Sequence, residues 1–207
     1  MAILLASILA LSGVRAGAQT LRYSIECGKS RSEAVFESIR EGDHIILETT
    51  IGSQNGSQTL DLDYQTLYWH MADPERDLDI TVTRSDGVFR IKGRFEGEAL
   101  DRVLADSGKP WYQHIGFSAG HALKEGTTTF VCVRPTDLEM FEMLATPKGT
   151  VEFGGGKPVR VKVSPSGALS RLWSCDYYYD PESLDFFGYK AVEGGPGTPV
   201  TLWKPLR

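Results

Sequence analysis

The sequence lacks the basic runs and long apolar segments that mark nucleic-acid-binding and membrane-spanning proteins. Its 207 residues carry a formal net charge of −5. A mildly acidic chain without a basic cluster argues against nucleic acid and against an anionic membrane surface as partners. No segment beyond the N-terminus approaches the roughly 20 apolar residues of a transmembrane helix. We therefore predict no transmembrane segment in the mature chain.

Metal and phosphate motifs are missing as well. The 4 histidines form no H-E-x-x-H pair, and the 3 cysteines do not have zinc-finger spacing. Residues 154–157 read Gly-Gly-Gly-Lys, but Val151 stands where a phosphate loop needs its first glycine, and Pro158 replaces the magnesium-binding Ser or Thr. The sequence thus predicts no metal site and no cofactor.

The first 18 residues have the pattern of a secretory signal peptide. Residues 2–11 are apolar and too few to span a bilayer as a helix, and Ala16-Gly17-Ala18 forms a small-x-small cleavage site before Gln19. We expect a periplasmic or secreted protein whose residues 19–207, which contain no linker, form a single β-rich domain.

Cysteines Cys27, Cys132 and Cys175 remain after this processing. In an oxidising compartment one pair can form a disulfide and leave one thiol over, and all three pairings are open. A Cys27–Cys175 bridge would tie the first strand to a late one. The alternative is three buried, reduced thiols that pack as small apolar residues.

Alternation of apolar and polar residues dominates from Thr20 onward. Tyr23 and Ile25 share one face of a first strand while Arg22 and Ser24 share the other, and about twelve such short strands follow at the spacing typical of antiparallel sheets. We predict a mainly all-β fold, a single antiparallel meander that forms a strongly curved sheet or open barrel. One short helical or irregular crossover is expected near residues 96–126.

Three local features of this fold are also predicted. Asn55-Gly56 is a strong signal for a tight hairpin turn. Leu67 continues the buried alternation of Trp69 and Met71. Residues 98–107 have the pattern of a short amphipathic helix.

The sharpest catalytic motif is Gly116-Phe117-Ser118-Ala119-Gly120, which matches the G-x-S-x-G nucleophile elbow. That elbow follows a buried strand of a parallel sheet, whereas the aromatic residues 110–114 precede this one. Its catalytic histidine lies far downstream, whereas the only histidine after Ser118 is His121. A turn of small residues that packs closely is the favoured interpretation.

Residues 169–189 combine aromatic rings with carboxylates. Such a combination can bind a sugar, and paired carboxylates can hydrolyse a glycoside. The favoured interpretation is a late strand, with Leu169, Arg171, Trp173 and Cys175 on one face, followed by an acidic turn. The carboxylates concerned are Asp176, Asp180, Glu182 and Asp185.

Ligand contacts are expected where amphipathic aromatic residues cluster, because Trp, Tyr and His offer an apolar body with a polar tip. The candidates are Trp111, Tyr112 and His114 in the crossover, and Tyr177 and Tyr179 in the late strand.

The overall pattern resembles exported bacterial β-rich domains of unknown function, grouped as DUF3108 and DUF6134. The resemblance rests on Leu21-Arg22-Tyr23-Ser24-Ile25 directly after the signal, on the long meander, and on residues 167–173 (GALSRLW). It covers most of the mature chain and implies a curved antiparallel sheet related in shape to lipoprotein-carrier half-barrels. It assigns no catalytic residues.

From these observations we expect an envelope protein without enzymatic activity that binds an apolar ligand or a protein partner on its curved sheet. An exported hydrolase acting on polysaccharide or ester, and a purely structural module, are the alternatives. An open groove favours the first, paired carboxylates in a cleft the second, and a filled core the third.

Overall fold

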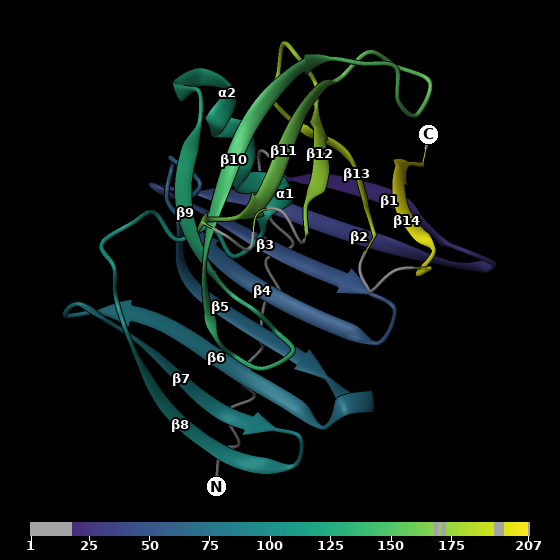
Figure 1. Cartoon of the computed structure of the whole chain (residues 1–207). Coiled ribbons are helices and arrows are strands. Elements are labelled where there is room, and N and C mark those ends of the chain that lie inside the picture. Colours follow the sequence, from purple (N-terminus) through teal and green to yellow (C-terminus); the bar gives the residue numbers. More distant parts are fainter. Residues whose placement is uncertain (1–17, 168–169, 171–172, 193–196, 207) are drawn as a thin grey trace, which may run out of the picture.

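A computed structural model describes residues 18–167, 170, 173–192 and 197–206, and it has the predicted all-β fold. One antiparallel sheet contains 14 strands and does not close on itself (Figure 1). The strands are β1 (Gln19–Cys27), β2 (Ser30–Glu41), β3 (His44–Ile51), β4 (Gln54–Leu60), β5 (Thr66–Asp73), β6 (Leu78–Ser85), β7 (Val88–Phe95), β8 (Glu98–Ala105), β9 (Thr128–Val133), β10 (Met140–Thr150), β11 (Val159–Pro165), β12 (Cys175–Tyr179), β13 (Phe186–Val192) and β14 (Val200–Pro205).

The first and last strands pair in the middle of this sheet. The strand order is β8-β7-β6-β5-β4-β3-β2-β1-β14-β13-β12-β11-β10-β9, so each half of the chain forms a meander that runs outward from the β1–β14 pair. The two free edges, β8 and β9, are consecutive in the chain. In Figure 1 the two meanders curl toward each other as a lower arm (β2–β8) and an upper arm (β9–β13).

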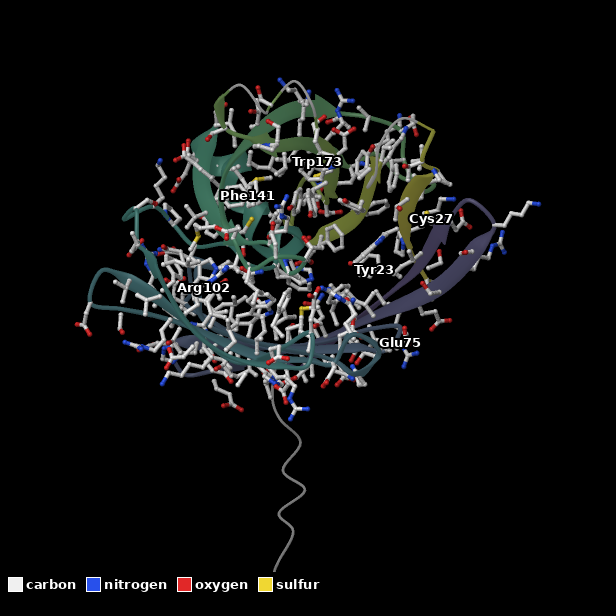
Figure 2. The ribbon with its side chains drawn as sticks, turned by 60° about the horizontal axis from the view of Figure 1, so that its bottom comes forward. Tyr23, Cys27, Glu75, Arg102, Phe141 and Trp173 are labelled. Carbon is white, nitrogen blue, oxygen red and sulfur yellow. The ribbon has the colours of Figure 1, made fainter. Side chains whose placement is uncertain are left out.

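The inner face of this curled sheet holds the core, as the alternation on β1 predicts. Tyr23 and Ile25 are buried, while Arg22 and Ser24 lie on the opposite face. Figure 2 shows the labelled Tyr23 side chain between the two arms. Its hydroxyl donates a hydrogen bond to the carbonyl of Phe186 on β13 (2.6 Å), and this bond ties the middle of the sheet to the upper arm.

The crossover between the two edge strands occupies the interior instead of running over the surface. Residues 106–127 contain two short α-helices, α1 (Ile115–Ser118) and α2 (Ala122–Glu125), and a 3-10 turn between them (Ala119–His121). Ahead of α1, Trp111 forms a parallel bridge with Val131 of β9, and its carbonyl accepts a hydrogen bond from the Thr66 amide of β5 (2.7 Å). This segment therefore links the two arms from inside.

Side chains also close the gap between the two edges. Arg102 on β8 donates hydrogen bonds to the carbonyls of Asp137 and Leu138, both at 3.2 Å, in the loop that leads to β10. It also forms a salt bridge with Glu139 at 3.3 Å. Arg102 lies where the two arms face each other in Figure 2.

Three local predictions are wrong. The region predicted as a helix, residues 98–107, contains strand β8, because a turn at Glu96 and Gly97, both with positive φ, sends the chain back along β7. Leu67 is exposed, because a bulge between β4 and β5 interrupts the alternation at that residue. The turn between β3 and β4 falls at Gly52, whose φ of 60° suits it, so that Asn55-Gly56 lies within β4.

The late strand begins at Cys175 and is followed by the predicted acidic turn. Asp180 accepts hydrogen bonds from the amides of Glu182 and Ser183, both at 2.9 Å, which fixes the turn between β12 and β13. Leu169 and Arg171, which were predicted to share a face with Cys175, lie outside the described residues, as does the predicted signal peptide up to residue 17.

Candidate functional site

A cleft of about 370 Å³ opens between the first strands and the crossover. Its walls come from β1–β3, the β4–β5 turn, α1, α2 and the turn before β13. The apolar lining residues are Leu21, Ile39, Ile45, Leu62, Tyr64, Phe117, Leu184 and Phe186, and the polar ones are Gln19, Ser38, Arg40, Lys124, Ser183 and Asp185. It is the larger of the two hollows described. We call it the charged cleft because charged side chains line it.

Three charged side chains lie at the rim of the charged cleft. Arg40, Lys124 and Asp185 all line it and are all exposed. Among the described residues neither cation forms a salt bridge, and Arg40 has one side-chain hydrogen bond, which it donates to the carbonyl of Gly42 (3.4 Å). The rim thus has two cations and one carboxylate, with a net charge of +1.

A smaller hollow of about 160 Å³ lies further along the same strands. Ile45 of β3 lines the charged cleft, whereas Thr49 and Ile51 of the same strand line the second hollow. On the crossover, Phe117 lines the cleft and His114 lines the second hollow; the two rings are in T-shaped contact with centroids 5.1 Å apart. These rings divide the two spaces.

No charged residue lines this second hollow, which we call the neutral cavity. Its lining residues are Thr49, Ile51, Gln54, Asn55, Gly56, Gln58, Trp69, Met71, Gln113, His114 and Pro135. Burial of the imidazole lowers the pKa of His114 from 6.5 to about 4, because a charged ring would lose its hydration there. His114 is therefore neutral at physiological pH.

Of the five predicted ligand-binding residues, only His114 lines either hollow. Trp111 is fully buried against Phe89, with ring centroids 5.0 Å apart, and Tyr112 packs on Phe130. We reassign Trp111 and Tyr112 from ligand contact to core packing.

The two tyrosines of β12 belong to the core as well. Tyr179 is fully buried, and its hydroxyl donates a hydrogen bond to the carbonyl of Ile115 at 3.0 Å. Tyr177 contacts the rings of Phe186 and Tyr189. Burial raises the pKa of both tyrosines well above the ordinary value. These hydroxyls therefore stay protonated, and Tyr179 holds α1 against the upper arm.

The contacts of Ser118 are those of a residue that stabilises the fold. It lies at the end of α1, is fully buried, and donates a hydrogen bond from Oγ to the carbonyl of Tyr64 at 2.8 Å. The neighbouring Gly120 packs so closely that an added Cβ would lie 3.0 Å from the carbonyl oxygen of Leu184. The motif is therefore the close-packed turn of small residues that the sequence favours, and the preceding strand that a nucleophile elbow requires is replaced by residues 110–114.

The acidic residues of the late stretch serve the turn or the sheet surface. The backbone amides of Ser183 and Glu182 donate hydrogen bonds to the Asp180 carboxylate and hold its pKa below the ordinary value. Asp176 faces Arg160 across the β11–β12 pair at 3.9 Å. Only Asp185 lines the charged cleft.

The described residues do not contain the predicted Cys27–Cys175 disulfide, and Cys27 and Cys132 are free thiols. Strands β14 and β13 lie between β1 and β12, which puts Cys27 about 14 Å from Cys175 along the sheet at ~4.8 Å per strand, far beyond the Cα separation of a disulfide. Burial raises the pKa of Cys132 to about 12, so this thiol is a poor nucleophile.

Among the described residues, no group of three or more His, Cys, Asp and Glu side chains is placed to hold a metal ion. In the same part of the chain, none of the helices has the length and apolar character needed to cross a bilayer.

The fold and the two hollows define a β-barrel-like domain with a plugged interior. No family model and no curated protein matches the sequence. A solved structure does match, namely the crystal structure of a beta-barrel-like protein of the domain of unknown function DUF1849 from Brucella abortus. The match has a TM-score of 0.62 and 9% sequence identity, and covers 94% of this chain and 98% of that chain.

This neighbour shows the fold alone. It supports an all-β domain of unknown function, and it does not support the resemblance to DUF3108 and DUF6134.

Apart from His114 and Asp185, sequence reasoning did not select the residues that shape the two hollows. Arg40, Lys124 and Asp185 lie on β2, on α2 and before β13, so their proximity depends on the curl of the sheet. Gln58 lies in the polar strand β4, whose composition suggests solvent exposure, yet it is buried. Its position between Gly56 and the buried Leu60 on the inward-facing alternation is the one signal that was available.

Proposed function

We propose that this chain is an exported envelope protein without enzymatic activity that binds an anionic amphiphile in the charged cleft. The observation that carries this proposal is the pairing of an apolar lining with two rim cations that form no salt bridge with the described residues.

The apolar part of the ligand would lie against side chains from separate elements. Leu21 comes from β1, Ile45 from β3 in the lower arm, Phe117 from α1 and Phe186 from β13. A volume of 370 Å³ falls in the range of roughly 300–1,000 Å³ typical of small-molecule sites, which are mostly apolar with a few polar groups. An acyl chain or a comparable apolar group fits this lining.

The head group would be a carboxylate, sulfonate or phosphate. Arg40 and Lys124 offer donors to such an anion, whereas Asp185 alone would oppose it. Because these side chains are exposed, each cation is expected to contribute only about 0.2–1 kcal/mol, and this contribution falls with salt.

Export rests on the signal-like residues 1–18, and the position of β1 supports it. The first strand begins at Gln19, directly after the predicted cleavage site. The N-terminal sequence of protein recovered from the periplasm or medium tests this part, since a mature chain beginning at Gln19 is expected and an intact Met1 there would contradict it.

Ligand binding is tested by titrating the chain with dodecanoate and following displacement of the anionic fluorophore 8-anilinonaphthalene-1-sulfonate. The double variant Arg40→Gln/Lys124→Gln should bind dodecanoate roughly tenfold more weakly, the sum of two exposed ion pairs. The control Lys29→Gln/Lys148→Gln makes the same charge change at exposed residues outside the cleft lining, Lys29 on the β1–β2 turn and Lys148 on β10.

Two results would overturn the proposal. One is that dodecanoate does not displace the fluorophore from the wild-type chain. The other is that the control pair weakens binding as much as the cleft pair does, which would mean that net charge, and not the charged cleft, governs binding.

A further inference from the structure

Aromatic rings close the inner end of the charged cleft. Of its lining residues, Phe117 is half-buried and Phe186 is buried, whereas Arg40 and Lys124 at the rim are exposed. The rings of Phe117 and Phe186 have centroids 6.3 Å apart, and both contact the fully buried ring of Phe36, at 5.4 and 6.5 Å. An apolar chain whose head group lies at the rim cations would therefore end against these rings.

Behind Phe117 the interior opens again into the neutral cavity. The Phe117 ring contacts that of His114, with centroids 5.1 Å apart, and His114 lines the neutral cavity. On β3 the fully buried Leu47 lies between Ile45, which lines the cleft, and Thr49, which lines the cavity. The partition between the two spaces is thus made of a few side chains, and Phe117 is the one that faces the cleft from the crossover.

The space beyond this partition suits hydrocarbon. Trp69 and Met71 line the neutral cavity from β5, Ile51 lines it from β3, and no charged residue lines it. Its 160 Å³ corresponds to about five methylene-sized groups at ~30 Å³ each. The chain length that the cleft accepts is therefore limited by the partition and not by a continuous core behind it.

From this arrangement we infer that Phe117 sets the length of the apolar chain that the charged cleft accepts, and that the ligand is a medium-chain amphiphile. The inference rests on the proposed function, because it takes an anionic amphiphile as the occupant of the cleft. The 370 Å³ of the cleft corresponds to about twelve methylene-sized groups at ~30 Å³ each. A longer chain would have to displace the Phe117 ring from its contacts with Phe36 and His114, which close packing opposes.

The wild-type chain tests this with the saturated fatty acids from octanoate to hexadecanoate, each followed by displacement of 8-anilinonaphthalene-1-sulfonate. Affinity should rise roughly fourfold with each added methylene group, at about 0.8 kcal/mol per buried CH₂, and should stop rising once the chain reaches Phe117. In NMR spectra, the terminal methyl group of bound dodecanoate should contact the Phe117 ring. These two measurements need no variant, so they hold even if a substituted chain fails to fold.

The variant Phe117→Ala removes the ring that ends the cleft. Its space has room for roughly two to three further methylene groups, so this variant should bind hexadecanoate at least tenfold more tightly than dodecanoate. The wild-type chain should bind these two fatty acids about equally well. The matched control Phe187→Ala removes the same ring from a half-buried residue outside both linings, and it should keep the wild-type length limit.

The possible failures are distinguishable. If the wild-type chain binds none of these fatty acids, both this inference and the proposed function are overturned. If it binds them but Phe117→Ala keeps the same length limit as the wild type and Phe187→Ala, this inference alone is overturned. A terminal methyl group of dodecanoate that lies away from Phe117 has the same consequence.

Discussion

The interior has a filled half and a half with hollows, and the same short crossover segment contributes side chains to both. Between β5–β7 and β9 the space is filled, because Trp111 packs in a cluster with Phe89, Ile91 and Val131. Along β2–β5 the core is interrupted by the two hollows, and His114 and the residues after it separate the charged cleft from the neutral cavity.

The backbone of the crossover explains this difference. Around Trp111 the segment is bonded to β9 on one side and to β5 on the other, so its side chains fill the space as those of a strand would. From Ile115 the chain turns into α1, whose single turn covers less of the wall. A change of backbone conformation within a few residues thus separates the filled core from the region with the two hollows.

Replacing Trp111 with Ala should produce the largest effect, because it empties the filled half. Loss of a fully buried Trp ring is expected to lower the free energy of unfolding by about 3–5 kcal/mol, as measured by urea denaturation. Leu67→Ala, at a residue that is 41% exposed, is the control and should change stability by no more than about 0.5 kcal/mol. A loss below about 1 kcal/mol at Trp111 would mean that the filled half does not hold the arms together.

The next largest effect concerns His114 and pH. The pKa of this ring is about 4 in the folded chain against 6.5 for an ordinary histidine, so the unfolded chain binds the proton more readily between these values. Stability should therefore decrease as the pH falls from 6.5 toward 4, by about 3 kcal/mol at 1.36 kcal/mol per pKa unit.

Denaturation of the wild-type chain and of His114→Phe across this pH range measures the histidine contribution as the difference between their slopes. An NMR titration of the rings, with the exposed His44 for comparison, gives the pKa directly. A His114 ring that titrates near 6.5 would contradict the burial on which the contrast between the two halves depends.

Sequence reasoning recovered the architecture because strand alternation repeats along the whole chain. The all-β class, the antiparallel meander and an irregular crossover all follow from it, and the structure confirms them. Edge strand β8 was mistaken for a helix because Leu100 and Leu104 fit both periods, and only the turn at Glu96-Gly97 distinguishes them.

The candidate sites were largely beyond the reach of the sequence. Aromatic residues such as Trp111 and Tyr179 are amphipathic whether they pack a core or line a pocket, and the curl of the sheet decides between the two. Arg40 of β2 and Lys124 of α2 line the same cleft because the crossover that carries α2 runs through the interior of the curled sheet. His114 was selected because the crossover was expected to carry ligand contacts, and it does line a cavity.

The smallest predicted effect is that of Ser118→Ala, at the point where the crossover meets the wall of the charged cleft. Ser118→Ala removes the hydrogen bond from Oγ to the carbonyl of Tyr64, which lines the charged cleft, and should lower the free energy of unfolding by about 1 kcal/mol. Ser107→Ala, at an exposed residue ahead of the segment, is the matched control and should have no measurable effect.

Hydrolysis of p-nitrophenyl butyrate provides the second measurement. If Ser118 acts only as a structural donor, the wild-type and Ser118→Ala chains hydrolyse this ester equally slowly. An esterase activity that disappears in Ser118→Ala, with stability unchanged, would instead identify Ser118 as a nucleophile.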